Sequence, residues 1–310
     1  MFKAYDVRGR TDNGELNPDL FRKIGGAFVS LFDSDEVAVG RDCRESSASL
    51  FDALVDGITA AGSDVVDLGL VPTDLVYFYS GKYSVPGAMI TASHNPPEYN
   101  GLKLCREGAA PVGAETGLVE IEKVAIEDEV PRAAVPGSVR SVDAIDDYVD
   151  HLLAIVDGSS IGPLRIAVDG GNGMAGVTIE KVIARLEATL DGLYLEPDGT
   201  FPNHPADPIQ PENLKDLIAM VADGRHDLGV AFDGDADRAF FIDDQAEAVS
   251  GSTVTALIAR WMLQRHAGAS IIHNLNTSRA VPETVRAAGG IPIRTRVGHS
   301  YIKQVMAESG

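Results

Sequence analysis

The sequence predicts an α/β fold built from repeated three-layer α/β/α domains, with mixed and mostly parallel sheets. Three observations lead to this prediction. Short apolar segments alternate with helix-like segments, which is the order that builds a parallel sheet covered by helices on both faces. This alternation recurs three times without an identical sequence repeat. At 310 residues the chain is also longer than one typical domain, so we expect two or three domains.

The first strand–helix cycles occupy the N-terminal third of the chain. A helix is expected from Asn17 to Phe32, because Pro18 suits the first turn of a helix. The following helix ends at Gly62, a residue type that commonly closes helices. The remaining expected elements are strands over 37–40, 64–68 and 88–91, and helices over 46–62, 72–81 and 115–127, followed by a linker over 131–137.

The segment from Met89 to Lys103, MITASHNPPEYNGLK, joins an apolar run to a polar loop. Pro96 and Pro97 fix φ and remove backbone donors, so the loop cannot lie inside a helix or a central strand. We therefore expect Ser93 to be an exposed residue at the head of a stiff loop, as a nucleophile or a phosphoryl-carrying hydroxyl requires. Serine, histidine, asparagine and proline are also ordinary turn residues, so the alternative is a segment that only reverses the chain.

A second polar cluster follows the apolar run from Leu228 to Phe232, which predicts a buried strand. Asp233, Asp235 and Asp237 alternate with small residues and precede Arg238. Three carboxylates in this spacing can converge on one hard cation, whose other ligands come from water or a phosphate. The alternatives are an acidic surface loop and an EF-hand loop, and the EF-hand pattern fails because Arg238 stands where glycine belongs.

The third distinctive stretch is the glycine-rich segment 171–176, GNGMAG, which follows an expected strand over 164–169. It matches G-x-G-x-x-G, so a dinucleotide-dependent oxidoreductase is the main rival enzyme class. Glu196 or Asp198 could supply the acidic residue that such proteins carry about 20 residues later. A residue set for hydride transfer is not apparent elsewhere, so we interpret the glycines as a tight turn between a strand and a helix.

The last strand–helix cycle begins near Ser250, with a helix through Trp261 and another helix after Ser278. Strands are expected over 270–273 and 291–294, and a final helix follows His299. In open sheets ligands gather at the carboxyl ends of strands, which is where Ser93 and Asp233 stand. We assign three domains: one over 1–140 that carries the serine loop, one over 141–247 that carries the acidic loop as a metal-binding loop, and a third α/β domain over 248–310.

Together these motifs resemble the α-D-phosphohexomutases, in particular the phosphomannomutase/phosphoglucomutase branch. The resemblance is carried by TASHNP at 91–96 with NGLK at 100–103, and by DGDADR at 233–238. AYDVRG at 4–9 and VGHS at 297–300 extend it over essentially the whole chain. It implies an isomerase that interconverts hexose 1-phosphate and hexose 6-phosphate, of mannose or glucose, through a phosphoserine and a bisphosphate intermediate.

The resemblance also implies roles for individual residues. The catalytic residues would be Ser93, His94, Lys103 and Arg238. One Mg²⁺ per chain would be bound by Ser93, Asp233, Asp235 and Asp237, and a hexose 1,6-bisphosphate would be the activator. The substrate would contact Tyr5, Arg8 and His299, for which packing, a surface ion pair and a helix cap are the simpler alternatives.

Composition excludes several other classes of partner. A net charge of −20 argues against nucleic acid, whose phosphates are bound by an excess of Lys and Arg. We expect no membrane partner, because no apolar run is long enough to span a bilayer. Cys43 and Cys105 are too few for a disulfide framework, so we expect free thiols and a cytoplasmic location.

The resemblance further implies a sugar-hydroxyl loop in the third domain and a fourth domain, neither of which this sequence contains. We therefore expect either a truncated product or a fragment that a homo-oligomer or a complementing chain completes. Two other functions stay open at this point. One is a Mg²⁺-dependent sugar-phosphate phosphatase, and the other is a non-catalytic sugar-phosphate-binding subunit.

Overall fold

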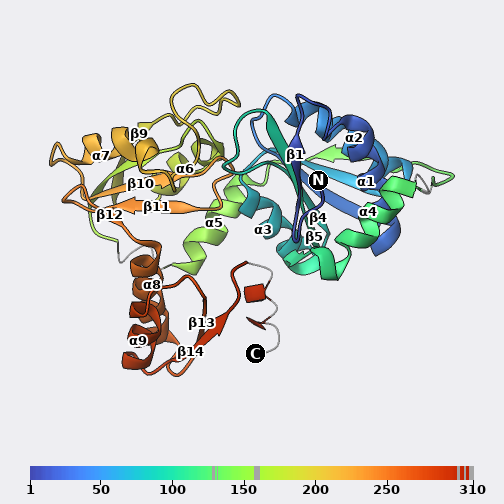
Figure 1. Cartoon of the computed structure of the whole chain (residues 1–310). Helices are drawn as coiled ribbons and strands as arrows, with labels where there is room; N and C mark the ends of the chain where they lie inside the picture. The colour runs from blue at the N-terminus through green and yellow to red at the C-terminus, as the bar shows by residue number, and fades with distance from the viewer. Residues whose placement is uncertain (128–129, 131, 157–160, 299–300, 304, 307–310) are drawn as a thin grey trace. The chain divides into compact units, whose positions relative to one another are not determined.

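The computed structural model describes the whole chain except residues 128–129, 131, 157–160, 299–300, 304 and 307–310. The chain divides into two compact units, Met1–Ala246 and Glu247–Gly310, and helices and strands occur in both (Figure 1). The first unit contains two separate sheets, and the second contains a two-stranded sheet. This mixed α/β architecture confirms the fold class predicted from the alternation of strands and helices.

The first sheet has seven strands in the order β1-β5-β4-β2-β3-β7, with β6 paired to β5. Strands β4, β2, β3 and β7 are mutually parallel, whereas β1, β5 and β6 pair in antiparallel register. The strands are Val7–Arg10 (β1), Glu36–Arg41 (β2), Asp64–Leu70 (β3), Gly87–Ile90 (β4), Tyr99–Arg106 (β5), Ala110–Pro111 (β6) and Val139–Ser141 (β7).

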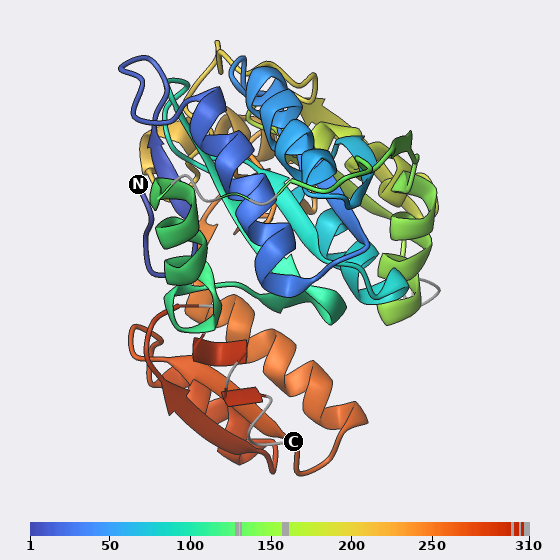
Figure 2. The ribbon, with the colours of Figure 1, turned by 90° about the vertical axis from the view of Figure 1, so that its right-hand side faces the viewer.

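Helices cover both faces of this sheet and produce three layers. Successive residues of a strand point to opposite faces, so Val37 and Val39 of β2 face one core while Ala38 faces the other. Helices α1, α2 and α4 pack in the first core, and α3 and α5 in the second. Figure 2 shows α1 and α2 (blue) side by side, with α4 (green) next to α1. The helices are Pro18–Phe32 (α1), Ser47–Ala60 (α2), Thr73–Tyr83 (α3), Leu118–Glu127 (α4) and Ile145–Ile155 (α5).

The strands of the second sheet that belong to this unit have the order β11-β10-β8-β9. Strand β10 is parallel to β8 and antiparallel to β11. Helix α7 packs beside Ala167 and Ala231, and helix α6 packs on the opposite face beside Val168 and Val230. The elements are Leu164–Asp169 (β8), Ile179–Ile183 (α6), Ala188–Leu193 (β9), Lys215–Val221 (α7), Leu228–Phe232 (β10) and Ala239–Ile242 (β11).

The second unit starts with the short strand β12 (Ala248–Val249) and has parallel strands at its centre. Its elements are Gly251–Arg265 (α8), Ser270–Asn274 (β13), Ala280–Ala287 (α9) and Ile291–Thr295 (β14). Leu263 of α8 and Val281 and Val285 of α9 form its small core. Within the described part of the chain, no helix is both long enough and apolar enough to cross a membrane.

Several local expectations differ from the structure. The single helix expected over 115–127 is split into a short 3₁₀ turn, Ala114–Thr116, and α4, because Gly117 between them has φ 127°. Lys103, expected in the serine loop, lies on strand β5, which pairs with β4 so that Lys103 is opposite Met89. Helix α5 and strands β1 and β7 were not expected at all.

Candidate active site

Ser93 follows strand β4 and has φ 53°, in the left-handed region that a non-glycine residue seldom adopts. Its backbone N–H donates to Thr91 Oγ1 at 2.8 Å, which fixes the turn. Ser93 is only 5% exposed, so the expectation of an exposed serine was wrong. The loop that follows β10 covers it, since a Cβ on Gly234 would collide with the Ser93 carbonyl oxygen.

A buried arginine, Arg44, holds the serine loop in shape. It lies in the turn after β2, and its side chain has no exposed surface. The guanidinium donates to the backbone carbonyls of Ser93 (2.9 Å), Asn95 (2.7 Å), Pro96 (2.7 Å) and Tyr99 (3.1 Å). Its Nε also donates to Asp42 Oδ2 at 3.1 Å, so the charge is paired as well as hydrogen-bonded. Arg44 was assigned no role from the sequence, although a cluster of charged residues at a strand end was the available signal.

The Ser93 hydroxyl lies between a carboxylate and a guanidinium. Ser93 Oγ donates to Asp233 Oδ2 at 2.6 Å, and Arg238 Nη2 donates to Ser93 Oγ at 2.8 Å. His94 Nδ1 is 3.3 Å from the same oxygen and accepts from Arg238 Nη2. Burial and the neighbouring Arg238 lower the pKa of His94, which keeps the imidazole neutral near pH 7. The structure thus brings together three of the four residues predicted to be catalytic.

Lys103, the fourth, joins this group from β5. Its Nζ lies 2.6 Å from Asp235 Oδ2 and 2.6 Å from Asp237 Oδ2. Burial by itself would lower the pKa of Lys103, but the two carboxylates more than offset it and raise the pKa. Lys103 is therefore a cation near pH 7, suited to stabilise negative charge rather than to accept a proton.

Asp233, Asp235 and Asp237 offer carboxylate oxygens that all lie within 4.8 Å of one another. Asp233 and Asp235 are fully buried, and burial with the two neighbouring acids raises the pKa of Asp233 to about 7. Asp235 Oδ1 is buried and has no hydrogen-bond partner among the described residues. Oxygen ligands and an unpaired buried carboxylate oxygen are what a hard divalent cation such as Mg²⁺ requires, so these residues fit the predicted ion.

The glycine-rich turn supports the acidic loop. Met174 N–H donates to the Gly234 carbonyl at 2.9 Å, and a Cβ on Gly173 would lie 2.6 Å from the same oxygen. Gly171 and Asn172 have φ values of 54° and 55°, which build the tight turn. Close packing and turn geometry therefore account for these glycines, in agreement with their interpretation as a strand-to-helix turn.

Of the three residues predicted to contact substrate, Arg8 forms a hydrogen bond to the serine loop. Arg8 contacts the serine loop, because its Nη1 donates to the Ala92 carbonyl at 2.9 Å and to Asn95 Oδ1. Its Nη2 donates to Asp6 Oδ2 at 2.7 Å. Tyr5 is 43% exposed, and its role stays a prediction. His299 lies outside the described residues.

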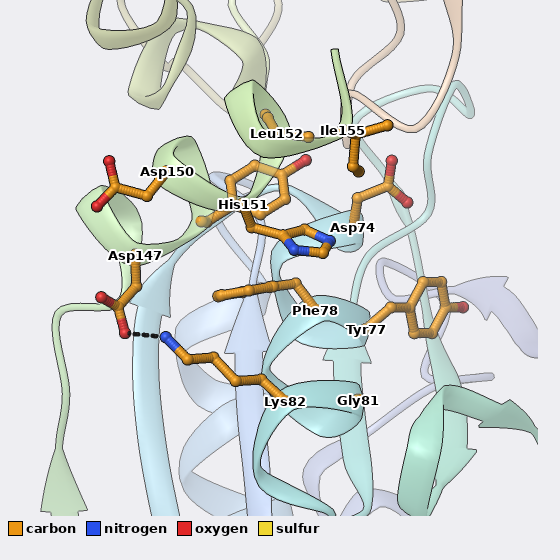
Figure 3. Close-up of a pocket in the computed structure, with 11 residues that line it drawn as sticks. Asp74, Tyr77, Phe78, Gly81, Lys82, Asp147, Asp150, His151, Leu152 and Ile155 are labelled. Carbon is orange, nitrogen blue, oxygen red and sulfur yellow. Dashed lines mark hydrogen bonds and ion pairs between the residues drawn. The ribbon is translucent and has the colours of Figure 1, made fainter. Parts of the chain in front are cut away.

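A hollow of about 810 Å³ lies between α3 and α5 (Figure 3). The Phe78 and His151 rings lie 4.9 Å apart in it, and Lys82 Nζ is 2.7 Å from Asp147 Oδ2 at its edge. Among the described residues, its lining includes none of those predicted for catalysis, metal or substrate. This hollow therefore does not mark the predicted chemistry, whereas the convergence of charged groups around Ser93 does.

His204 gives the second sheet a pH-dependent contact. Its Nε2 is 3.0 Å from the buried Asp169 carboxylate, and its Nδ1 is 2.9 Å from the Pro205 carbonyl. Both ring nitrogens therefore face acceptors, and the Asp169 hydrogen bond raises the pKa of His204. Because the folded pKa exceeds the unfolded value of about 6.5, the pairing stabilises the fold fully below that pH and is lost as pH rises through the folded pKa.

We accordingly expect the free energy of unfolding of the unaltered chain to fall as the pH rises above about 6.5 and through the folded pKa of His204, and His204→Gln to make that fall smaller. Urea denaturation at several pH values measures the difference. His266→Gln, at an exposed histidine, is the matched control and should follow the unaltered chain. An unchanged pH dependence in His204→Gln would contradict the charged pairing.

Comparison with known proteins identifies the family of this chain. The chain matches the models of the phosphoglucomutase/phosphomannomutase α/β/α domains I, II and III over residues 1–130, 146–247 and 250–310. A phosphomannomutase of Salmonella montevideo is 39% identical over 98% of this chain and 68% of its own length. The crystal structure of a phosphoglucomutase/phosphomannomutase family protein from Burkholderia thailandensis superposes with a TM-score of 0.90 at 35% identity, covering 100% of this chain and 69% of that one. A putative phosphomannomutase from Thermus thermophilus gives a TM-score of 0.88 at 25% identity, covering 100% of this chain and 72% of that one.

The fold and the site thus define a phosphotransferase of the mutase class, a phosphohexomutase. The chain belongs to the phosphoglucomutase/phosphomannomutase family. The resemblance drawn from the sequence motifs is confirmed, and with it the assignment to the isomerases of carbohydrate metabolism.

Proposed function

We propose that this phosphohexomutase interconverts the 1-phosphate and the 6-phosphate of mannose or glucose, with Ser93 as its phosphoryl carrier. The observation that carries the proposal is the position of Ser93 Oγ, 2.6 Å from Asp233 Oδ2 and 2.8 Å from Arg238 Nη2. The Asp233 carboxylate would repel an ionised or phosphorylated oxygen on Ser93 unless nearby cations offset its negative charge. Arg238 and Lys103 supply fixed positive charge on either side of the acidic loop.

The chemistry divides among the residues as follows. In the forward step the bond between phosphorus and Ser93 Oγ breaks as phosphorus bonds a sugar hydroxyl oxygen, giving a hexose 1,6-bisphosphate. We assign the hydroxyl proton to His94, which is neutral because its pKa is lowered. His94 Nδ1 is 3.3 Å from Ser93 Oγ, and we assign it the transfer of one proton to that oxygen when its bond to phosphorus has broken, so the step balances. Arg238 and Lys103 stabilise charge on the transferring group. In the second step the other phosphoryl group returns to Ser93, so the bisphosphate is both intermediate and activator.

The acidic loop supplies the carboxylate ligands of the proposed metal site. Asp233, Asp235 and Asp237, with an oxygen on Ser93, would hold one Mg²⁺ per chain. When bound, this ion supplies positive charge that offsets the charge developing in phosphoryl transfer. The role of the chain's own carboxylates is to fix that charge beside Ser93, and Asp233, fully buried, makes the direct contact with the serine.

The test is an isomerisation assay of this chain with mannose 1-phosphate and glucose 1-phosphate, a catalytic amount of hexose bisphosphate and Mg²⁺. We expect ³¹P NMR to show hexose 6-phosphate, formation of which stops on adding EDTA and resumes with excess Mg²⁺. Asp235→Asn should abolish turnover, whereas Asp56→Asn, at a 67% exposed acid, should not. Release of free phosphate without the isomer would instead identify a sugar-phosphate phosphatase, and binding without either product a non-catalytic role.

A further inference from the structure

We propose that Thr73 is a positioning residue for the metal site, because its hydroxyl turns Asp235 so that Oδ1 remains the oxygen open to a cation. This inference rests on the proposed metal site. Thr73 is the first residue of α3 and lies 162 positions before Asp235 in the sequence. Neither residue has exposed surface, so their contact is shielded from water.

Thr73 holds Asp235 at two points. The Thr73 N–H donates to the Asp235 backbone carbonyl at 3.0 Å, and Thr73 Oγ1 donates to Asp235 Oδ2 at 2.6 Å. The first N–H groups of a helix have no acceptor inside the helix, so the carbonyl of Asp235 satisfies one of them. Pro72 precedes the helix with φ −66° and ψ 155°, an extended conformation that directs the chain into α3. Backbone and side chain of Asp235 are thereby both fixed to the start of one helix.

The two oxygens of Asp235 have different surroundings. Oδ2 accepts two short hydrogen bonds, from Thr73 Oγ1 and from Lys103 Nζ, both at 2.6 Å. Oδ1 is buried without a partner among the described residues. A buried carboxylate oxygen without a partner is unfavourable, and a divalent cation is the group that would complete it.

Removing the Thr73 hydroxyl should change the hydrogen bonding of the two Asp235 oxygens. Lys103 already bridges Asp235 and Asp237. Without the threonine donor, the Asp235 carboxylate is free to rotate toward the Lys103 ammonium, which then competes with the cation for both oxygens. Thr73 therefore differs from a residue that merely packs α3 against the loop, because its effect depends on a hydroxyl and not on a volume.

The experiment compares Thr73→Val, which keeps the shape but loses the hydroxyl, with Thr73→Ser, which keeps the hydroxyl. Mn²⁺ serves as the probe, and its free concentration is followed by electron paramagnetic resonance without substrate. Loss of an outer-shell partner typically weakens metal affinity about 10–100-fold, so we expect that increase in Kd for Thr73→Val. Thr73→Ser should stay within about threefold of the unaltered chain, as should Thr59→Val, whose hydroxyl bonds the Val55 carbonyl in α2.

The outcomes separate this inference from the metal site on which it rests. If the unaltered chain does not bind Mn²⁺, or Asp235→Asn binds it equally well, the proposed metal site fails. If the unaltered chain binds Mn²⁺, Asp235→Asn loses it and Thr73→Val retains full affinity, the role of Thr73 is overturned alone. Equal losses in Thr73→Ser and Thr73→Val would also overturn it, since the hydroxyl would then not matter.

A second measurement keeps the test valid if Thr73→Val is less stable than the unaltered chain. Each variant is melted in EDTA and again in a fixed excess of Mn²⁺, and only the rise in Tm caused by the ion is compared. A ligand that binds the folded state alone stabilises it according to its affinity. We expect a smaller rise in Thr73→Val than in Thr73→Ser, and equal rises would contradict the proposal.

Discussion

The Ser93→Ala variant is expected to lose phosphate incorporation and to turn over at least about 10⁴-fold more slowly, because the phosphoryl carrier is removed. The surrounding charges stay in place. Arg238 keeps its ion pair with Asp233, and Lys103 keeps its ion pair with Asp235. Only the hydroxyl between Asp233 and Arg238 disappears. Binding of sugar phosphate should therefore persist while transfer stops.

Labelling measures this directly. The chain is incubated with hexose bisphosphate, and intact-protein mass spectrometry records the gain of one phosphoryl group, which peptide mapping then assigns. Ser49→Ala is the matched control, because Ser49 is an exposed serine on α2 that bonds the Ser46 carbonyl. Full labelling of Ser93→Ala, at whatever residue, would end the assignment of Ser93 as the carrier.

The elements that the sequence predicts well are those with a local cause. Helix α1 begins where Pro18 suits a first turn, and Asn17 caps it by accepting from Leu20 N–H at 3.0 Å. Strands β2 and β10 are short apolar runs that lie in sheet interiors, as their composition indicates. In each case the residues that fix the element lie within a few positions of it.

Strand β5 could not be predicted from its own residues. Its residues follow Pro96 and Pro97, and those prolines led to a prediction of continuous loop through Lys103. The strand forms because β1 and β4 pair with it on either side, and this pairing joins segments far apart in the sequence. As a result, the Lys103 side chain is directed by a sheet toward Asp235 and Asp237.

The residue types of the candidate site could be predicted from the sequence, but the way these residues are arranged in space could not. Ser93 and the three aspartates were identified from motifs, but the burial of Ser93 depends on the acidic loop 140 positions later. Thr73 and Arg44 carry no motif that a local pattern would single out. Their importance comes from what they touch, so it appears only once the chain is folded.

Arg44→Ala should lower the free energy of unfolding by about 3–5 kcal/mol, the usual cost of removing one partner from a buried ion pair. Asp42, which is 2% exposed, would lose its cation, and four carbonyls of the serine loop would lose their donor. The loop would also lose the contacts that hold Ser93 at a positive φ, so turnover should fall together with stability.

Two further variants show whether the cause is the guanidinium geometry. Arg44→Lys keeps the charge, yet a single ammonium cannot reach four acceptors in one plane, so it should recover only part of the loss. Arg22→Ala removes an exposed arginine paired with Asp56, and such surface pairs contribute about 0–1 kcal/mol. Urea denaturation followed by circular dichroism supplies the comparison. If Arg44→Ala were as stable as Arg22→Ala, the serine loop would have to be held by its prolines and the Thr91 turn instead.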